Sequence, residues 1–408
     1  MRTTKCSVSA PVNPLRSSAA ISMLAAVLCQ PLDAGDWPRW RGPDGDGTSE
    51  ETGLIHRFPA SGPKVLWRAK LGTGFSGLSV ADGRVFSLFG ENGREKIICF
   101  DALSGKEIWK VDSDADFAQG RSFGPRATPF VDGKLVYTAG GSGKLSCMVA
   151  ATGKEIWSFN LYSKYHMQAH DEGFSCSPQV DGDKLVVSGG TAVFAFNKSD
   201  GKLAWRALEE KMNHSTPRFA KIDGRHQLVV LTAENLVGLD PESGDELWRH
   251  PQRAVNCATP AVGPGGRIFI AAAYGFGCQL VEVTGGTPEQ VYWNNDLATH
   301  HATAMIYDRK LYGFHDRRGT FKCLDFLTGE EEWESEAPGK GKLIIADGQM
   351  IIVTEDGRLV LAVPTPDGYT ETARAKVVDG ISYTAPSLAN GKLYIRSNEE
   401  MVCIDFKP

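Results

Sequence analysis

Asp101-Ala-Leu-Ser-Gly-Lys-Glu-Ile-Trp109 is a phrase that this chain repeats, and the repetition reveals its architecture. Close variants end at Trp205, Trp248 and Trp333, and a shorter variant without the leading Asp ends at Trp157. In each copy a Gly supplies the positive φ of a tight turn, and Asp or Asn side chains hydrogen-bond the turn backbone. Each copy therefore predicts a strand, a tight turn and a second strand that carries the Trp.

A second phrase alternates with the first and consists of a two-residue turn followed by a β-rich run. Its eight copies are Asp82-Gly83, Asp132-Gly133, Asp181-Gly182, Asp223-Gly224, Gly265-Gly266, Asp308-Arg309, Asp347-Gly348 and Asn390-Gly391. Asp-Gly and Asn-Gly between apolar runs are strong signals for a β-hairpin. Two hairpins per unit give four short antiparallel strands, and no stretch shows sustained helical periodicity. The pattern predicts an all-β fold, an eight-bladed β-propeller of four-stranded antiparallel blades.

The two ends of the repeat region indicate how the ring closes. The last unit ends at residues 401–406, its third strand, and has no Trp strand after it. The first Trp strand, around Trp67, has no blade before it. Pairing this N-terminal strand with the C-terminal blade would remove both free edges. The alternative is an open ring of seven blades with frayed ends.

The first 34 residues have the pattern of a signal peptide. Arg2, Lys5 and Arg16 are followed by the apolar run 19–29, which is too short to span a bilayer, and Gly35 follows a small residue. Lipidation at Cys29 is an alternative, but Leu28 stands where a lipoprotein signal has a small residue. We expect an exported protein, periplasmic or extracellular, with a lead segment at 35–62 packed on the propeller, a propeller at 63–408 and no transmembrane segment.

Cysteine usage and charge exclude several classes of function. Of the cysteines after the leader, Cys99, Cys147, Cys323 and Cys403 recur in the same context, which predicts small buried side chains rather than disulfides. No metal-ligand spacing such as CxxC is present, so the sequence predicts no metal site. With 44 Lys+Arg against 49 Asp+Glu, the net charge is −5, and we expect no nucleic-acid partner.

The phrase [Asp/Ala]-x-x-[Thr/Ser]-Gly-Lys-Glu-x-Trp resembles the tryptophan-docking repeat of the pyrroloquinoline-quinone-like β-propeller superfamily, over residues 63–408. In that superfamily the repeated Trp packs between blades and caps the turn of the next blade. The resemblance implies a structural docking role for Trp67, Trp109, Trp157, Trp205, Trp248, Trp293 and Trp333. The Trp-Pro-x-Trp-Arg-Gly-Pro opening of the lead resembles that of exported members, and we expect Trp37 and Trp40 to pin the lead to the propeller wall.

The superfamily contains two kinds of protein, and the sequence departs from both. Quinoprotein dehydrogenases hold the quinone and Ca²⁺ on the propeller axis, commonly under a vicinal Cys-Cys pair that this sequence lacks. Non-enzymatic members include the outer-membrane barrel-assembly lipoprotein. This chain departs from it as well, because the residues before Cys29 match a lipoprotein signal poorly. We predict an exported, non-enzymatic binding or assembly platform with no catalytic residues and no cofactor. The alternative is a pyrroloquinoline-quinone-dependent dehydrogenase with quinone and Ca²⁺ on the axis.

The loops that enter the innermost strand of each blade line one rim of a propeller, where ligands usually bind. Polar residues gather in these loops, and the candidate ligand-binding residues are Arg126, His170, His214, Asn256, His300, His301 and Tyr383. They would bind a small molecule, an anion or a protein partner on the rim of a monomer. Histidines with Asp171 and Glu172 would suit a metal, and solvated channel lining is the third interpretation. Imidazoles that titrate near pH ~6.5 would strengthen anion binding as the pH falls from about 8 to 6.

Overall fold

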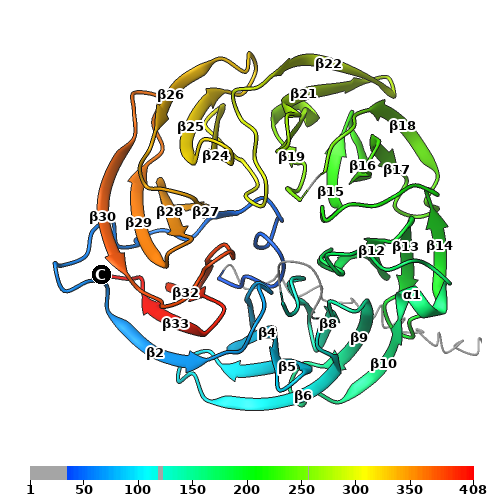
Figure 1. Ribbon diagram of the computed structural model, residues 1–408, viewed down its shortest axis with the longest axis horizontal. Coiled ribbons are helices and arrows are strands. Elements are labelled where there is room, and N and C mark those ends of the chain that lie inside the picture. The colour runs from blue at the N-terminus through cyan, green and yellow to red at the C-terminus, as the bar shows by residue number, and fades with distance from the viewer. Residues whose placement is uncertain (1–34, 118–122, 256) are drawn as a thin grey trace, which may run out of the picture. The chain divides into compact units, whose positions relative to one another are not determined.

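A ring of eight antiparallel sheets surrounds a central axis in the computed structural model, which describes residues 35–117, 123–255 and 257–408 (Figure 1). The expected signal peptide lies outside the described residues. The sheets follow one another around the ring in sequence order, which confirms the eight-bladed propeller. In the described part of the chain, no helix has the length and apolar character needed to cross a membrane.

The first four blades each contain four consecutive strands, from the innermost to the outermost. Blade 1 contains β3 (Ser79–Ala81), β4 (Arg84–Glu91), β5 (Arg94–Asp101) and β6 (Glu107–Ala115). Blade 2 contains β7 (Phe130–Asp132), β8 (Leu135–Ala139), β9 (Lys144–Val149) and β10 (Glu155–Asn160), followed by the short helix α1 (Leu161–Lys164). Blade 3 contains β11 (Gln179–Asp181), β12 (Lys184–Gly189), β13 (Ala192–Asn197) and β14 (Leu203–Ala207). Blade 4 contains β15 (Arg218–Ile222), β16 (Arg225–Leu231), β17 (Asn235–Leu239) and β18 (Glu246–Pro251).

The remaining blades follow the same plan, with an irregular turn in blade 5. Blade 5 contains β19 (Ala261–Val262), the 3-10 turn η1 (Pro264–Gly266), β20 (Ile268–Ala272), β21 (Gly277–Thr284) and β22 (Thr287–Asn294). Blade 6 contains β23 (Met305–Tyr307), β24 (Lys310–His315), β25 (Thr320–Asp325) and β26 (Glu331–Ser335). Blade 7 contains β27 (Gly341–Ala346), β28 (Gln349–Thr354), β29 (Arg358–Val363) and β30 (Thr370–Lys376). Blade 8 contains β31 (Ser387–Ala389), β32 (Lys392–Arg396), β33 (Glu400–Asp405) and β2 (Val65–Lys70).

Blade 8 closes the ring with strands from both ends of the propeller. Strand β2 pairs antiparallel with β33, and Trp67 lies opposite Cys403. The buried Arg396 then joins blade 8 to blade 1, because its guanidinium donates to the carbonyl oxygens of Gly74, Ser76 and Leu88 at 2.8–2.9 Å. The expectation of closure at eight blades is confirmed, and the open seven-blade alternative is wrong.

Every outermost strand shifts register near the position of the repeated Trp, and five indoles reach the next blade. A β-bulge of this kind re-aims the side chain that follows it. The Nε1 atoms of Trp67, Trp109, Trp157, Trp205 and Trp333 donate to the carbonyl oxygens of Ala102, Ala150, Lys198, Pro241 and Thr365 at 2.8–3.1 Å. Each acceptor lies in the turn that precedes the outermost strand of the next blade. The ring also covers that turn's Gly, as Trp67 covers Gly105.

Blade 5 breaks the docking pattern on both of its sides. Trp248 is buried against blade 5, but its Nε1 donates to Gln227 in its own blade, because Gly285-Gly286 replaces the turn that it would cap. Trp293 is 47% exposed, so the docking role expected for it is wrong. Tyr292 takes that role instead, and its hydroxyl donates to the Phe326 carbonyl at 3.2 Å.

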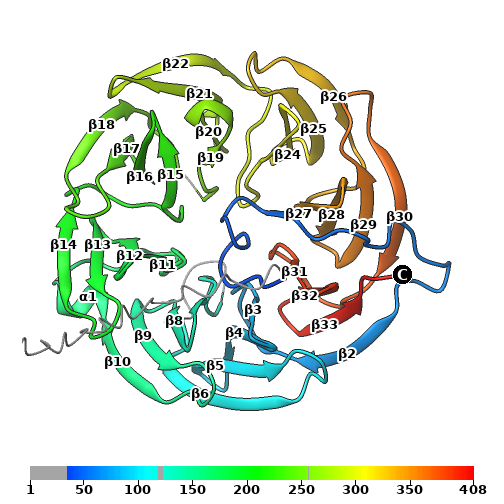
Figure 2. The same ribbon diagram turned by 180° about the vertical axis from the view of Figure 1, so that it is seen from behind.

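The lead segment lies across the centre of the ring and not along its outer wall, which corrects the expectation for Trp37 and Trp40 (Figure 2). Trp37 bridges to Val80 of blade 1, and the Pro38 carbonyl accepts from the Val131 amide of blade 2. At the other side of the ring, strand β1 (Thr48–Ser49) pairs parallel with β27 of blade 7. The innermost strands offer free edges toward the axis, and the lead uses them as hydrogen-bond partners.

Side chains of the lead bind the blades between these two points. The Trp40 indole donates to Thr259 of blade 5, and Arg39 donates to Gln179 of blade 3. The guanidinium of Arg41 is buried and contacts the Met305 sulfur of blade 6 at 2.9 Å. Asp46 accepts from Thr48 in a tight turn and lies 3.9 Å from Arg218 of blade 4.

The lead therefore covers one face of the propeller, which we call the turn face. This face carries the two-residue turns at Asp82, Asp223, Asp308, Asp347 and Asn390, all with positive φ. Several of these turns hydrogen-bond the lead, since the Asn390 amide donates to Gly35 and Asp347 accepts from Leu54. The docking turns lie on the same face, because the Ala102 amide donates to Gly83.

Candidate functional site

The opposite face, which we call the loop face, carries the loops that enter the innermost strands. The structure gathers there the side chains of Arg126, Glu172, His170, His214, Cys257, His300, His301, Lys342 and Tyr383, which we call the rim cluster. These residues come from the loops or strand starts of blades 2 to 8, so only closure of the ring brings them together. Asn256, also a candidate, lies outside the described residues.

Four imidazoles form two close pairs in the rim cluster. The ring centroids of His170 and His214 are 4.2 Å apart, and those of His300 and His301 are 3.7 Å apart. The Nδ1 atom of His214 lies 2.7 Å from the Ser175 hydroxyl. Electrostatic coupling of His214 to His300, and of His301 to His214 and Arg126, joins the two pairs into one site.

The surroundings disfavour charge on these imidazoles. Burial lowers the pKa of His214 to about 3, and the neighbouring His170 and Arg126 act in the same direction. Burial lowers the pKa of His301 to about 3 as well, together with the charge of Lys342, and it also lowers the pKa values of His170 and His300. The His214 and His301 rings therefore carry no charge between about pH 6 and 8. This corrects the expectation that anion binding would strengthen as the pH falls from about 8 to 6. That expectation depended on imidazoles that titrate near their ordinary pKa.

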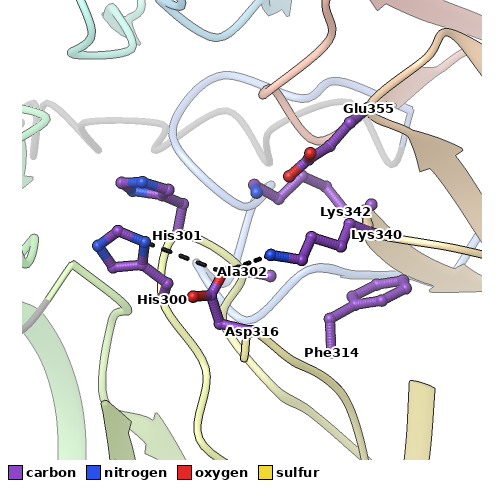
Figure 3. A pocket seen from close by; sticks show the side chains of 9 residues that line it. His300, His301, Ala302, Phe314, Asp316, Lys340, Lys342 and Glu355 are labelled. Carbon is purple, nitrogen blue, oxygen red and sulfur yellow. Dashed lines mark hydrogen bonds and ion pairs between the residues drawn. The ribbon is translucent and has the colours of Figure 1, made fainter. Parts of the chain in front are cut away.

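Charged side chains surround a small pocket beside His300 and His301 (Figure 3). Asp316 lies between His300 and Lys340, at 4.0 Å from the His300 Nδ1 and 3.1 Å from the Lys340 Nζ. Lys342 is only 6% exposed, and burial lowers its pKa to about 8 although the carboxylates of Glu355 and Asp316 oppose this effect. A lysine with this pKa exchanges its proton near neutral pH and is typical of binding sites.

Sequence reasoning missed three members of this site for identifiable reasons. Cys257 stands in the same loop position as His214, but it lies in no metal-ligand spacing such as CxxC, so no pattern in the sequence indicated it. Asp316 and Glu355 lie in the turns after β24 and β28, whereas the candidate residues were sought in the loops that enter the innermost strands. These turns and the entering loops lie on the same face, because each strand reverses the direction of the one before it. The acids Asp171 and Glu172 do not belong to the metal-ligand group that the described residues contain.

Exposed aromatic side chains lie on the loop face. Tyr274 is 75% exposed in the turn between β20 and β21, and its hydroxyl lies 3.1 Å from His300. The other exposed aromatic residues of the described chain are Phe123, Trp293 and Tyr383, which lie in entering loops or at the loop-face end of β22. The exposed aliphatic side chains are spread over both faces and the outer strands, so the aromatic residues alone distinguish the loop face as a candidate interaction surface.

The donor set of the site does not fit the quinone and Ca²⁺ that related propellers hold on their axis. Ca²⁺ takes six to eight oxygen ligands, mostly carboxylates and carbonyls. Among the described residues, the group that could hold a metal ion consists of Cys257, His300 and His301, which offer sulfur and nitrogen. The lead occupies the axis at the turn face with Trp40 and Arg41, whose partners are side chains of the blades.

A closed ring of eight blades, five of which dock a repeated Trp on the next blade, defines this chain as a member of the quinoprotein-like class of β-propellers. A family model described as "Outer membrane protein assembly factor BamB" matches residues 51–120 and 94–335, which is more than half of the chain. The chain belongs to this BamB-like propeller family.

Curated relatives agree with this assignment at low identity. The outer membrane protein assembly factor BamB of Bordetella pertussis is 24% identical over 372 residues, covering 86% of this chain and 89% of the relative. The factor of the same name from Yersinia pestis is 25% identical over 350 residues, covering 83% of this chain and 77% of the relative.

Two solved structures share the fold. BamB from Moraxella catarrhalis matches with a TM-score of 0.63 and 18% identity, over 84% of this chain and 97% of that chain. The quinohemoprotein alcohol dehydrogenase from Comamonas testosteroni matches with a TM-score of 0.61 and 12% identity, over 92% of this chain and 81% of that chain. At these identities both likenesses concern the fold alone, because one propeller fold serves many functions.

Proposed function

We propose that this chain is an exported, non-enzymatic propeller that binds a partner protein on its loop face and serves as a platform in outer-membrane protein assembly. The observation that carries the proposal is the set of exposed aromatic side chains on the loop face, with Tyr274 and Tyr383 among them. Aromatic side chains of this kind supply the anchors of protein interfaces. The turn face is covered by the lead, so a partner meets an open surface on the loop face.

The family assignment supports the assembly role. The curated relatives are named as outer membrane protein assembly factors and align over most of their length. A quinone-dependent dehydrogenase has weaker support, because the donor atoms of the site do not suit Ca²⁺. The rim residues Arg126, His170, His214, His300 and His301 then provide polar contacts beside exposed aromatic side chains, and protein interfaces combine both kinds of contact.

Site-specific photo-crosslinking in living cells of the source organism tests the platform. A photoreactive amino acid at Tyr274 or Ile381 should capture an outer-membrane assembly protein, identified by mass spectrometry. Leu203 is the matched control, because it is 42% exposed on the outermost strand of blade 3 and far from the rim. Equal capture from both places, or no capture from the loop face, would contradict the proposal.

The export component has its own test. The mature protein should begin near Gly35, without a lipid, and fractionate outside the cytoplasm. N-terminal sequencing and mass determination of native material check this. A chain that still starts at Met1 would overturn export, and a lipid on Cys29 would replace soluble export by membrane anchoring.

A further inference from the structure

Two loops from neighbouring blades bring three side chains that can bind a metal together on the loop face. Cys257 precedes β19 of blade 5, and His300 and His301 precede β23 of blade 6. One ligand atom from each of the three residues lies within 4.8 Å of the other two. We propose that Cys257, His300 and His301 form a binding site for a thiophilic transition-metal ion, such as Zn²⁺ or Cu⁺.

The donor types favour this class of ion over others. Thiolate sulfur with two imidazole nitrogens is a common ligand set for zinc and for copper, whereas Mg²⁺ and Ca²⁺ take oxygen ligands. Imidazole binds a metal in its neutral form, through a ring nitrogen that carries no proton. Three protein ligands also leave a further coordination position for water or an incoming ligand.

Cys257 differs from the other cysteines of the described chain. Cys99, Cys147, Cys176, Cys278, Cys323 and Cys403 are buried, whereas Cys257 is partly exposed. The buried thiols fill space inside and between blades, so a metal has no path to them. Only Cys257, among the described cysteines, is partly exposed and lies beside two imidazoles.

Neighbouring groups already hold the His300 ring in place, as hydrogen-bonding neighbours of metal-binding histidines do. One ring nitrogen lies 3.1 Å from the Tyr274 hydroxyl, and the Nδ1 atom lies 4.0 Å from Asp316 Oδ1. Asp316 is in turn held by Lys340 at 3.1 Å. A carboxylate near the imidazole raises its basicity and therefore its strength as a ligand.

The charge balance near the site permits a cation. Arg126, Lys340 and Lys342 carry positive charge, and Glu172, Asp316 and Glu355 carry an equal negative charge close to them. Thiolate formation adds one negative charge at the ligand itself. The entering metal displaces the thiol proton to solvent as the metal–sulfur bond forms.

Cobalt binding to the purified, reduced mature chain tests the site directly. Co²⁺ should bind with one equivalent and give a thiolate-to-cobalt charge-transfer band, and Zn²⁺ should displace it. The Cys257→Ser variant should lose the band, and both Cys257→Ser and His301→Ala should weaken Zn²⁺ binding by about tenfold or more. Cu⁺ competition would show which of the two ions the site prefers.

His226→Gln is the matched control. His226 is an exposed imidazole on blade 4 that pairs with Asp181 of blade 3, away from the rim. This variant should keep the band and the Zn²⁺ affinity. Zn²⁺ should also slow alkylation of Cys257 in the wild-type chain, a readout that does not depend on folding of a variant. Absence of stoichiometric binding, or a band that survives Cys257→Ser, would overturn the proposal. These measurements involve no partner protein, so their outcome is separate from that of the platform proposal.

Discussion

The turn face and the loop face of this propeller are built from the same eightfold repeat, yet they differ in almost every physical property. At the turn face, residues 35–51 lie across the axis and bind all eight blades. At the loop face, four imidazoles, a thiol and several charged groups share one small region beneath exposed aromatic side chains. One face is finished by the chain itself, and the other is left open.

The difference shows where stability and function are separated in this molecule. Buried, hydrogen-bonded groups such as Trp37 and Arg41 stabilise the fold, and they occur where the lead covers the ring. Exposed apolar groups and crowded titratable groups contribute little to stability or oppose it, and they mark binding sites. We therefore expect substitutions on the turn face to unfold the protein and those on the loop face to change binding.

The largest effect is expected at the covered face. Trp37→Ala should lower the free energy of unfolding by about 3–5 kcal/mol, because a 2% exposed indole is removed from between blade 1 and the lead. Urea denaturation followed by circular dichroism measures the change. A loss below about 1 kcal/mol would mean that the lead rests on the ring without stabilising it.

Two tryptophans of the same repeat sharpen the comparison. Trp109 is 8% exposed and docks on a turn of the covered face, so Trp109→Ala should cost about 3–5 kcal/mol. Trp293 is 47% exposed and donates to Phe276 on the loop face, so Trp293→Ala should cost under about 1 kcal/mol. Equal losses in urea denaturation would contradict the assignment of docking to Tyr292.

A buried acid between blades 1 and 2 gives the next largest effect and makes stability depend on pH. The Glu95 carboxylate is fully buried and accepts from the Gly141 amide at 2.8 Å. Burial raises its pKa from 4.5 to about 7, against the effect of that hydrogen bond, and the charges of Asp116 and Asp114 raise it further. Between these two pKa values the folded chain binds more protons than the unfolded chain, so stability falls as the pH rises.

Glu95→Gln should remove this dependence. The variant should gain about 3 kcal/mol relative to wild type between pH 4.5 and pH 7, the window set by the two pKa values. The difference should be complete above that window and absent below it. Unfolding by urea at several pH values measures it, and parallel stability curves for the two proteins would contradict the prediction.

The smallest effect on stability is expected at the open face. Tyr274→Ser and Ile381→Ser should change the free energy of unfolding by no more than about 0.5 kcal/mol, because both side chains are exposed. The same substitutions should reduce capture of the partner by crosslinkers placed elsewhere on the rim. Normal capture with both substitutions present would show that these exposed side chains are not part of the interface.

The docking side chains illustrate how far the sequence reaches. The repeat predicted the blades, the closing strand and the position of each Trp, because turn chemistry and strand alternation are local properties. The exchange of roles between Trp293 and Tyr292 was not predictable in the same way. Blade 5 has a Gly285-Gly286 hairpin and a bulge between Leu280 and Val281, and their combined register decides which aromatic ring faces blade 6.

The sequence by itself determined the number of blades, their strand order and the loops that carry the candidate residues. Only the tertiary structure decided that the lead crosses the axis and that Cys257 meets His300 and His301. The lowered pKa values of the rim imidazoles also arise only in the folded ring, where burial and neighbouring charges act on them. The physical reason is that local turn and strand preferences depend on a few neighbouring residues, whereas crowding, burial and contacts across the axis exist only after the first and last blades have paired and closed the ring.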